Sequence, residues 1–261
     1  SKVLEEAESL KKMGVTFTKP TIDIDLVRDW KNKVVSQLSG GIGQMAKARK
    51  VNTIQAEATF LSDNEVQLKS ESSTEKITFD HCIVASGSSS TIIPGIPFDN
   101  ENVLTSKTAL DLKKIPESLL VIGGGYIGLE MGTVFSALGS SVSVAEFLPN
   151  LLPGADPDLV KPLARKLKKE FSEIHLSTKI TKVEQAKSGV MDVTMEKNGE
   201  EIIKQYEQVL VSVGRKPNTE KMGVDKTNIK VNEQGFIPVD KYQQTSVKNI
   251  FTIGDIVGNP M

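Results

Sequence analysis

The sequence predicts an α/β protein with two domains, and three observations lead to this. Residues 119–122 form a continuous apolar run, which is typical of a strand buried on both faces of a parallel sheet. A glycine-rich turn, a helical segment and a second strand follow this run directly. By contrast, residues 51–90 contain short apolar stretches separated by turn residues, as in small antiparallel hairpins. A chain of 261 residues is longer than one small core needs and shorter than three domains need.

The N-terminal part is predicted to contain two helices and then short strands. Apolar residues at helical spacing indicate a helix over 2–12 and a long helix over 23–50 that begins at Asp23 or Asp25. Residues 40–43 (GGIG) follow a helix and not a strand, so we interpret them as a helix break and not as a phosphate-binding turn. Short strands bounded by turn residues are then expected at 52–60, 65–69, 76–78 and 81–86.

A proline-containing stretch, residues 93–97, is the best candidate for a boundary, and alternating strands and helices follow it. We expect strands at 119–122, 142–146 and 174–183, with helices at 126–138 and 156–171 between them. Pro157 suits the first turn of the second of these helices. The remaining strands are expected in a small meander, at 190–196, 201–206 and 208–213, and then at 235–239 and 250–253.

Composition excludes several classes of function. The 32 Lys and Arg residues balance the 33 Asp and Glu residues, giving a formal net charge of −1, so we expect no nucleic-acid partner and no anionic membrane partner. No apolar stretch approaches the roughly 20 residues of a membrane-spanning helix. The single cysteine, Cys82, excludes a disulfide framework and any metal site built from several cysteines. We expect it to be a small buried apolar side chain.

The glycine-rich turn carries the first functional signal. Gly123, Gly125 and Gly128 match the pattern GxGxxG, with Gly124, Tyr126 and Ile127 at the other positions. The pattern is weak alone, but here a buried strand precedes it and a helix follows it. In this geometry the first glycine permits the turn, the second lets a pyrophosphate approach the backbone, and the third lets the helix pack on the strand. The helix dipole and free N–H groups favour the phosphate charge. The turn therefore predicts a Rossmann-like dinucleotide site.

Glu146, at the end of the next strand, predicts which dinucleotide binds. A carboxylate in this position accepts hydrogen bonds from the adenosine ribose and repels a 2′-phosphate. No Lys, Arg or His occurs between Met131 and Val160 to attract such a phosphate. We therefore expect NAD and not NADP. The alternative is that Glu146 is an ordinary solvated acid at a strand end.

Two further fragments are weaker signals. Residues 82–87 form an apolar strand that ends in Ala85, Ser86 and Gly87, where a backbone can approach a ligand closely. Residues 250–255 form a short strand that ends in Gly254 and Asp255. An acid there suits a polyol hydroxyl, although acids at such positions are as often helix caps or turn formers.

Together these motifs resemble a known family. The stretch TSKTAL from Thr105, the run LLVIGGGYIGLEMGTVFSALGSSVSVAEF from Leu119, VGRKPN from Val213 and IFTIGDIVG from Ile250 are similar to the dihydrolipoamide dehydrogenases. These belong to the flavoprotein pyridine nucleotide–disulfide oxidoreductases. The resemblance covers the whole chain. It implies a Rossmann-like NAD-binding domain, residues 109–234, inserted in part of an FAD-binding domain, residues 1–108 and 235–261.

The resemblance also implies site residues. For NAD it adds Glu130, Ile180, Ser212, Val213, Gly214 and Arg215 to the glycine turn and Glu146, with Glu130 close to the contact between flavin and nicotinamide. The alternative for Glu130 is that it is an ordinary acid in the first turn of a helix, where the helix dipole favours a negative charge. For FAD it implies the backbone at Ala58, the segment Ala85, Ser86 and Gly87, and Asp255 as acceptor of a ribityl hydroxyl.

The implied reaction is a relay from a protein-bound dihydrolipoyl dithiol through an enzyme disulfide and FAD to NAD⁺. The family's own FAD-binding GxGxxG, redox cysteine pair and catalytic His are absent from this sequence. Neither end resembles a natural terminus, and residues 2–12 are not a signal peptide, so we expect an internal fragment with no catalytic residue of its own and no turnover alone.

The implied partners are the lipoyl-bearing acyltransferase or carrier protein of 2-oxo acid dehydrogenase complexes and a second copy in a homodimer. A low cysteine content fits a reducing compartment, here the bacterial cytoplasm or the mitochondrial matrix. The alternatives are a glutathione- or mercury-reducing relative, which the absence of cations near Glu146 disfavours, an NADH oxidase or peroxidase, and a non-catalytic NAD-binding module.

Overall fold

The computed structural model describes residues 2–18 and 20–258 and divides into two compact units. The first unit comprises Ser1–Gln37 and Ser90–Gly214, and the second comprises Leu38–Ser89 and Arg215–Met261. The chain therefore leaves the second unit at residue 89 and re-enters it at residue 215. The domain limits expected from the sequence, 108/109 and 234/235, stay a prediction. A compact unit defined by contacts can have other limits than a cofactor-binding domain.

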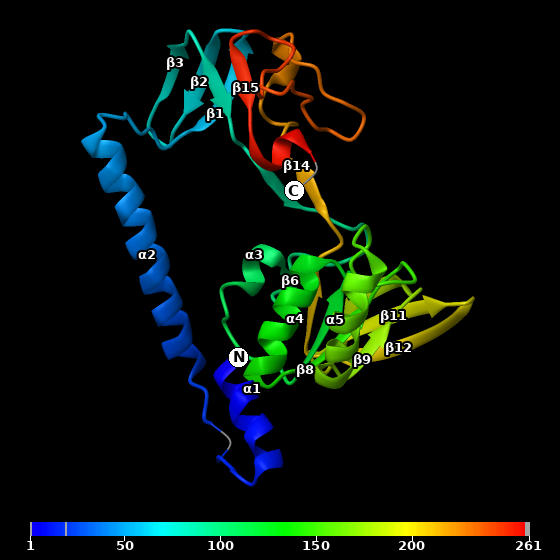
Figure 1. Cartoon of the computed structure of the whole chain (residues 1–261). Coiled ribbons are helices and arrows are strands. Elements are labelled where there is room, and N and C mark those ends of the chain that lie inside the picture. Colours follow the sequence, from blue (N-terminus) through cyan, green and yellow to red (C-terminus); the bar gives the residue numbers. More distant parts are fainter. Residues whose placement is uncertain (1, 19, 259–261) are drawn as a thin grey trace. The chain divides into compact units, whose positions relative to one another are not determined.

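A five-stranded parallel sheet forms the centre of the first unit (Figure 1). Its order is β6-β13-β7-β8-β9, with every neighbouring pair parallel. The apolar run expected at 119–122 lies within the middle strand and is buried throughout, as a strand covered on both faces requires. The five strands are β6 Val103–Thr105, β13 Gln208–Val211, β7 Ser118–Ile122, β8 Ser141–Ala145 and β9 Glu173–His175.

Helices α4 (Tyr126–Leu138) and α5 (Pro157–Glu170) pack on one face of this sheet, and their bounds agree closely with the sequence prediction. Asp156 caps α5 by accepting a hydrogen bond from the N–H of Asp158, and Pro157 occupies its first turn. The short α3 (Ser106–Ala109) begins at a capping box formed by Thr105 and Thr108.

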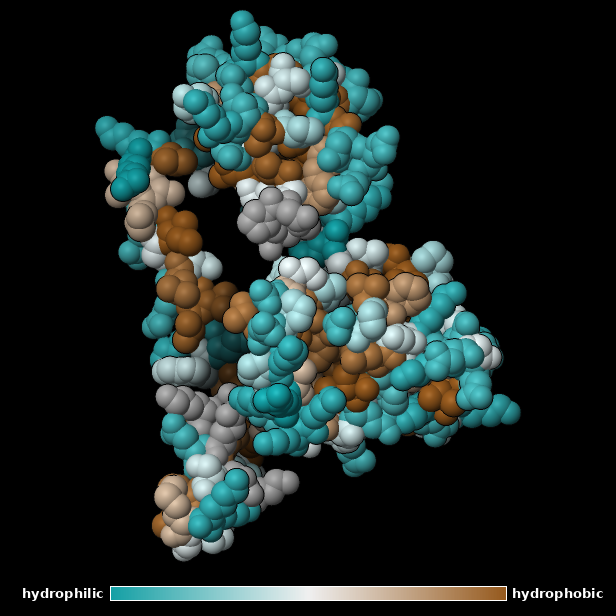
Figure 2. Space-filling view, turned by 45° about the vertical axis from the view of Figure 1, so that its right-hand side comes forward, coloured by the Kyte–Doolittle hydropathy of each residue, from teal (hydrophilic) through white to brown (hydrophobic). Residues whose placement is uncertain are grey.

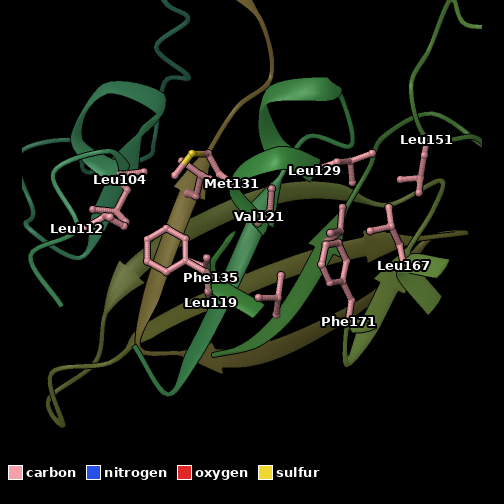
Figure 3. Close-up of a cluster of buried hydrophobic side chains, with 14 residues drawn as sticks. Leu104, Leu112, Leu119, Val121, Leu129, Met131, Phe135, Leu151, Leu167 and Phe171 are labelled. Atoms are coloured by element: carbon pink, nitrogen blue, oxygen red, sulfur yellow. The ribbon is translucent and has the colours of Figure 1, made fainter. Parts of the chain in front are cut away.

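The core below these helices is drawn in Figure 3. Phe135 of α4 and Leu167 of α5 are each 1% exposed and pack in one cluster with Leu119 and Val121 of β7 and with Phe171. Leu120 and Ile122 belong to a second cluster. Because successive side chains of a strand point to opposite faces, β7 supplies both cores in turn.

The second face of the parallel sheet packs against an antiparallel sheet of order β10-β11-β12. Its strands are β10 Lys179–Gln185, β11 Met191–Lys197 and β12 Glu200–Tyr206. Met191, Val193 and Met195 alternate along β11 and are fully buried in the second cluster.

Two strand predictions are wrong in this region. The single strand expected at 174–183 is two strands, β9 and β10, in different sheets, because Ser177 between them has a φ of 53° and turns the chain. The third meander strand, expected at 208–213, is β13, which pairs in parallel with β6 and β7. Leu210 of β13 lies in the first core cluster, and Val209 and Val211 lie in the second.

The N-terminal segment contains α1 (Lys2–Ser9), a 3₁₀ turn η1 (Leu10–Met13) and the long α2 (Ile24–Ala48). The cap predicted for α2 is confirmed, since the Asp23 carboxylate accepts hydrogen bonds from the N–H groups of Asp25 and Leu26. The helix break predicted at 40–43 is wrong, because α2 continues through it. A glycine costs a helix only about 1 kcal/mol relative to alanine, which is a weak bias and not a stop signal.

None of the described residues of α2 is buried, and its surface carries a row of hydrophobic side chains (Figure 2). Trp30 is 68% exposed and Leu38 is 66% exposed.

The second unit is built from small sheets. The antiparallel sheet β1-β2-β3 consists of β1 Glu57–Ser62, β2 Glu65–Lys69 and β3 Thr74–Thr78. Two strands pair in parallel, β4 Cys82–Val84 and β15 Ile250–Thr252, and the short β5 Ser88–Ser90 pairs with β14 Arg215–Pro217. The core of this unit contains Phe60, Val84, Ile237, Ile250 and Ile256. Two 3₁₀ turns, η2 Val224–Lys226 and η3 Gly254–Val257, complete it.

Two further expectations for this unit need correction. The strand β1 begins at Glu57 and not near residue 52. Residues 235–239 form no strand: Ile237 is fully buried, but its N–H donates to the carbonyl of Ile256 in η3, and the preceding loop is closed by bonds around Asn232. A buried apolar residue in a loop gives the same local pattern as a short strand.

Candidate functional site

The glycine turn, Gly123–Gly128, joins β7 to α4 and lies beside β8. Gly123 has a φ of 102°, where only glycine is free of strain. Its N–H donates to the carbonyl of Ala145 at 2.8 Å. A Cβ at Gly123 would lie 2.5 Å from the carbonyl oxygen of Ser212. Both the backbone conformation and the packing therefore require glycine at this position.

Gly128 is required by packing alone. It is buried in the first turn of α4, and a Cβ there would lie 2.5 Å from Ser212 Oγ and would overlap the carbonyl of Gly123. The absence of a side chain lets the helix approach the turn closely, which is the role predicted for the third glycine.

Gly125 differs from both. It has a φ of −76°, which any residue adopts, and a Cβ there would meet no atom within 4 Å. Neither conformation nor packing within the chain requires glycine at this position. Gly125 is the N-cap of α4 and supplies no side-chain cap, so the N–H groups of the first helical turn have no side-chain acceptor from it.

The Glu146 carboxylate lies directly against this turn. Glu146 is 7% exposed. Its Oε2 accepts a hydrogen bond from the N–H of Gly124 at 2.6 Å, and its Oε1 accepts one from the N–H of Leu148 at 2.7 Å. These bonds use two of about four acceptor positions of a carboxylate. No Lys, Arg or His among the described residues forms an ion pair with Glu146, and the hydrogen bonds to its carboxylate come from backbone N–H groups.

Residues 177 and 178, which lie between β9 and β10, hold the loop after β8 in place. Thr178, 2% exposed, donates its N–H to the carbonyl of Glu146 at 2.9 Å, and Ser177 donates its N–H to Leu148 at 3.1 Å. The sequence analysis did not assign these residues to the site. The contact is made by backbone groups, so no side-chain motif identifies it.

Ser212 connects the glycine turn to the end of β13. Its hydroxyl lies 3.1 Å from the carbonyl oxygen of Ile122 and 3.3 Å from that of Gly123, and donates to them. Val213 and Gly214 follow, and Val213 is 41% exposed. Ile180 packs on the core cluster that contains Ile122 and Val211. Ser212 therefore contacts the glycine turn directly, whereas Ile180 contacts the core cluster to which the neighbouring strand residues belong.

The remaining predicted residues of this group lie on α4. Tyr126 is 51% exposed, Ile127 is partly buried, and Glu130 is exposed.

A second group of predicted residues comes together in the second unit. The segment Ala85, Ser86 and Gly87 follows β4, and Ile253, just before Asp255, donates its N–H to the carbonyl of Val84. Asn218 bonds to this segment twice: its N–H donates to the carbonyl of Gly87 at 3.0 Å, and its Nδ2 donates to that of Ser86 at 2.8 Å. Asn218 was not predicted as a site residue, although it lies within the VGRKPN motif.

Arg215 belongs to this second group by its contacts. Its Nε donates to Ser88 Oγ at 2.6 Å, and it lies 3.6 Å from Asp255 Oδ2. The sequence analysis placed Arg215 with the NAD residues, whereas Ser212–Gly214 belong to the first unit and Arg215 begins the return segment of the second. Ala58 lies in β1 of the same unit and is exposed.

Cys82 is partly buried against the apolar core of the second unit, and burial raises the pKa of its thiol. This agrees with the expected packing role. The described residues contain no group of three or more His, Cys, Asp or Glu side chains placed to hold a metal ion. Within the same residues, no helix is both long and apolar enough to cross a membrane.

Comparison with known proteins gives consistent results. The model of the family described as pyridine nucleotide-disulphide oxidoreductase matches residues 1–261. Dihydrolipoyl dehydrogenase of Vibrio cholerae is 44% identical over 262 residues, which cover 100% of this chain and 55% of the relative. The corresponding protein of Bacillus subtilis is 38% identical, covering 98% of this chain and 54% of the relative. The chain thus spans about half the length of the curated relatives it matches.

The solved structures agree with the fold. The Cu(II) complex of the HOCl-induced flavoprotein disulfide reductase RclA from Escherichia coli matches with a TM-score of 0.79 and 25% identity, covering 88% of this chain and 52% of that one. The two-unit α/β architecture, the glycine turn and these similarities have one common explanation: this chain belongs to the pyridine nucleotide-disulphide oxidoreductase family.

Proposed function

We propose that the glycine turn and Glu146 form the NAD site of a dihydrolipoyl dehydrogenase. The dihydrolipoyl dehydrogenases of Vibrio cholerae and Bacillus subtilis align with 98–100% of this chain, at 44% and 38% identity. The single observation that carries the site assignment is Gly125, because neither its backbone conformation nor packing inside the protein requires a glycine there. A pyrophosphate approaching the open backbone at the start of α4 does explain it.

The environment of Glu146 supports a preference for NAD over NADP. The two backbone bonds fix the carboxylate beside the turn and leave further lone pairs for ribose hydroxyl groups. A 2′-phosphate would meet this negative charge with no paired cation to offset it. Glu146 thus acts as both a ribose acceptor and a repulsive element against the phosphorylated sugar.

We further propose that the second unit contributes to an FAD site through Ala58, Ala85, Ser86, Gly87 and Asp255. The flavin and the nicotinamide supply the redox chemistry, and the residues of this chain bind and orient them. The donor set fits: Asp255 offers a carboxylate, and the segment after β4 offers small side chains where a ligand can lie against the backbone.

For the whole protein we propose reoxidation of protein-bound dihydrolipoyl groups with reduction of NAD⁺, as part of a 2-oxo acid dehydrogenase complex. This chain holds one cysteine, whereas a redox disulfide needs two. We therefore expect no dihydrolipoamide–NAD turnover from these 261 residues alone. Turnover by the pure chain, in a spectrophotometric NADH assay, would contradict this.

Titration of the chain with NADH and NADPH, followed by calorimetry, tests the nucleotide site. We expect NADH to bind more tightly, and Glu146→Gln to weaken NADH binding by about 10-fold or more, which is the loss expected for hydrogen bonds to a charged group. Glu184→Gln, an exposed glutamate of β10 paired with Lys182, is the matched control and should change nothing. Tighter binding of NADPH would contradict the assignment of Glu146, and binding of neither would contradict the site.

A further inference from the structure

Asp255 is held by two side chains from distant parts of the sequence. Ser88 Oγ lies 2.5 Å from Asp255 Oδ2, and Arg215 contributes its Nε to Ser88 Oγ and its Nη2 to the carbonyl of Ser88, each at 2.6 Å. Arg215 also forms a direct ion pair with Asp255 Oδ2 at 3.6 Å. We refer to Ser88, Arg215 and Asp255 as the Asp255 cluster. All three residues lie in the second unit.

The chemistry of these groups fixes the direction of each hydrogen bond. A guanidinium only donates, and an ionised carboxylate only accepts. The Ser88 hydroxyl between them therefore accepts from Arg215 and must direct its single proton to Asp255. Both interactions converge on Oδ2. The fork of Arg215 reaches both the hydroxyl and the carbonyl of Ser88, so it also fixes the rotamer of the serine.

The other carboxylate oxygen is in a different state. Oδ1 of Asp255 accepts no hydrogen bond from any residue that the structure describes, and the Asp255 side chain is 36% exposed. The cluster thus turns one oxygen toward the protein and leaves the second to an outside donor. This asymmetry is what a carboxylate needs in order to accept one hydroxyl group in a defined direction.

We infer that Ser88 and Arg215 are positioning residues that orient Asp255 toward a hydroxyl group of the flavin's polyol chain. The inference rests on the proposed flavin site. Neither residue needs to touch the flavin: Ser88 and Arg215 act through Asp255. Ser88 was not among the site residues expected from the sequence, and Arg215 was expected to serve the other nucleotide.

The affinity for FAD tests the inference. It is measured on the full-length protein that the gene encodes, after its bound flavin has been removed. Quenching of FAD fluorescence gives the Kd, and a thermal melt of each apoprotein reports its folding. We expect Ser88→Ala to weaken FAD binding by about 5- to 10-fold, because Asp255 then loses one of the two contacts that orient it, and Arg215→Met to weaken it further. Ser88→Thr should restore the affinity. Arg215→Lys should not, because lysine lacks the fork. Ser246→Ala, whose hydroxyl donates to Asn228 in the same unit, is the control.

The inference further requires coupling: Ser88→Ala should have no additional effect in an Asp255→Asn background. If Asp255→Asn weakens FAD binding while Ser88→Ala and Arg215→Met leave it unchanged, the inference fails and the proposed flavin site stands. If Asp255→Asn has no effect, the proposed role of Asp255 fails, and the inference fails with it. An apoprotein that does not bind FAD at all contradicts both.

Discussion

Glu146 in the first unit and Asp255 in the second are acids held in opposite ways. Glu146 is 7% exposed and both of its oxygens accept backbone N–H groups, one of them from the glycine turn. The Asp255 side chain is 36% exposed and one oxygen contacts the side chains of Ser88 and Arg215. Glu146 is therefore fixed by backbone N–H groups, which no substitution other than proline removes, whereas Asp255 is fixed by side chains, which a substitution can remove. Substitutions near Glu146 should therefore affect folding and binding together, whereas substitutions near Asp255 should separate them.

The largest effect should come from Gly128→Ala. The added Cβ overlaps the carbonyl of Gly123 and lies 2.5 Å from Ser212 Oγ, so α4 must move away from the turn. Overpacking of this kind costs about 3 kcal/mol of the free energy of unfolding. Urea unfolding, followed by circular dichroism, measures this change. Gly43→Ala in α2, where a Cβ meets nothing within 4 Å, is the matched control and should not destabilise the chain. Equal stability of the two variants would show that the crowding at residue 128 is relieved at little cost.

The next effect is that of Glu146→Gln on stability. A glutamine side chain offers one acceptor oxygen where the two N–H groups of Gly124 and Leu148 need two, so one buried donor loses its partner. We expect a loss of about 1–3 kcal/mol in the free energy of unfolding at neutral pH, measured by the same urea titration. No change would mean that the carboxylate is not held by these two bonds.

A smaller effect is expected for Asp255→Asn without any flavin. The carboxylate and Arg215 are both partly exposed, and pairs of this kind contribute at most about 1 kcal/mol. The melting temperature of the apoprotein should therefore change by only a few degrees, in contrast with Glu146→Gln. A destabilisation as large as that of Glu146→Gln would remove the difference between the two acids.

The smallest effect concerns Glu173, an exposed acid that serves as a reference for both. A hydrogen bond from Lys204 lowers the pKa of Glu173, partial burial raises it, and His175 lowers it again, so that the net direction is down. A lowered pKa in the folded state stabilises the fold above the unfolded pKa of about 4.3, and this contribution is lost as the pH falls through the lowered pKa. Glu173→Gln should cost less than about 1 kcal/mol at pH 7 and nothing at pH 2. Urea titrations at the two pH values measure it, and a cost that persists at pH 2 would contradict the ion-pair explanation.

The sequence identified the glycine turn and Glu146 because their signals are local. The turn follows a strand with a continuous apolar run and needs glycine where the backbone or a close contact permits nothing else, and the acid directly follows the next strand, β8. The family resemblance then supplied residues whose individual signals are weak, such as Ala58 and Ile180. Ala58 lies in β1 and Ile180 in β10, and their roles in binding stay predictions.

What the sequence could not predict depends on contacts between distant segments. The turn at Ser177 forms because residues 177 and 178 donate their N–H groups to the loop after β8, and no residue type marks such a turn. Strand β13 joins the parallel sheet because its pairing partners are the remote strands β6 and β7. Ser88 becomes important only through Arg215 and Asp255, which are far away in the sequence. The helix break predicted at 40–43 was wrong because the low helix propensity of glycine is too weak to end a helix by itself.

Gly125→Ala tests the central claim most directly, since neither the backbone conformation nor packing within the protein requires a glycine at this N-cap. A Cβ there meets no atom within 4 Å and the φ of −76° is ordinary, so the free energy of unfolding should change by less than about 1 kcal/mol. If a dinucleotide's pyrophosphate lies against this backbone, calorimetric titration should show NADH affinity reduced by at least about 10-fold, since a misplaced phosphate loses charge-assisted hydrogen bonds. A stable variant that binds NADH as tightly as the unchanged chain would contradict the account.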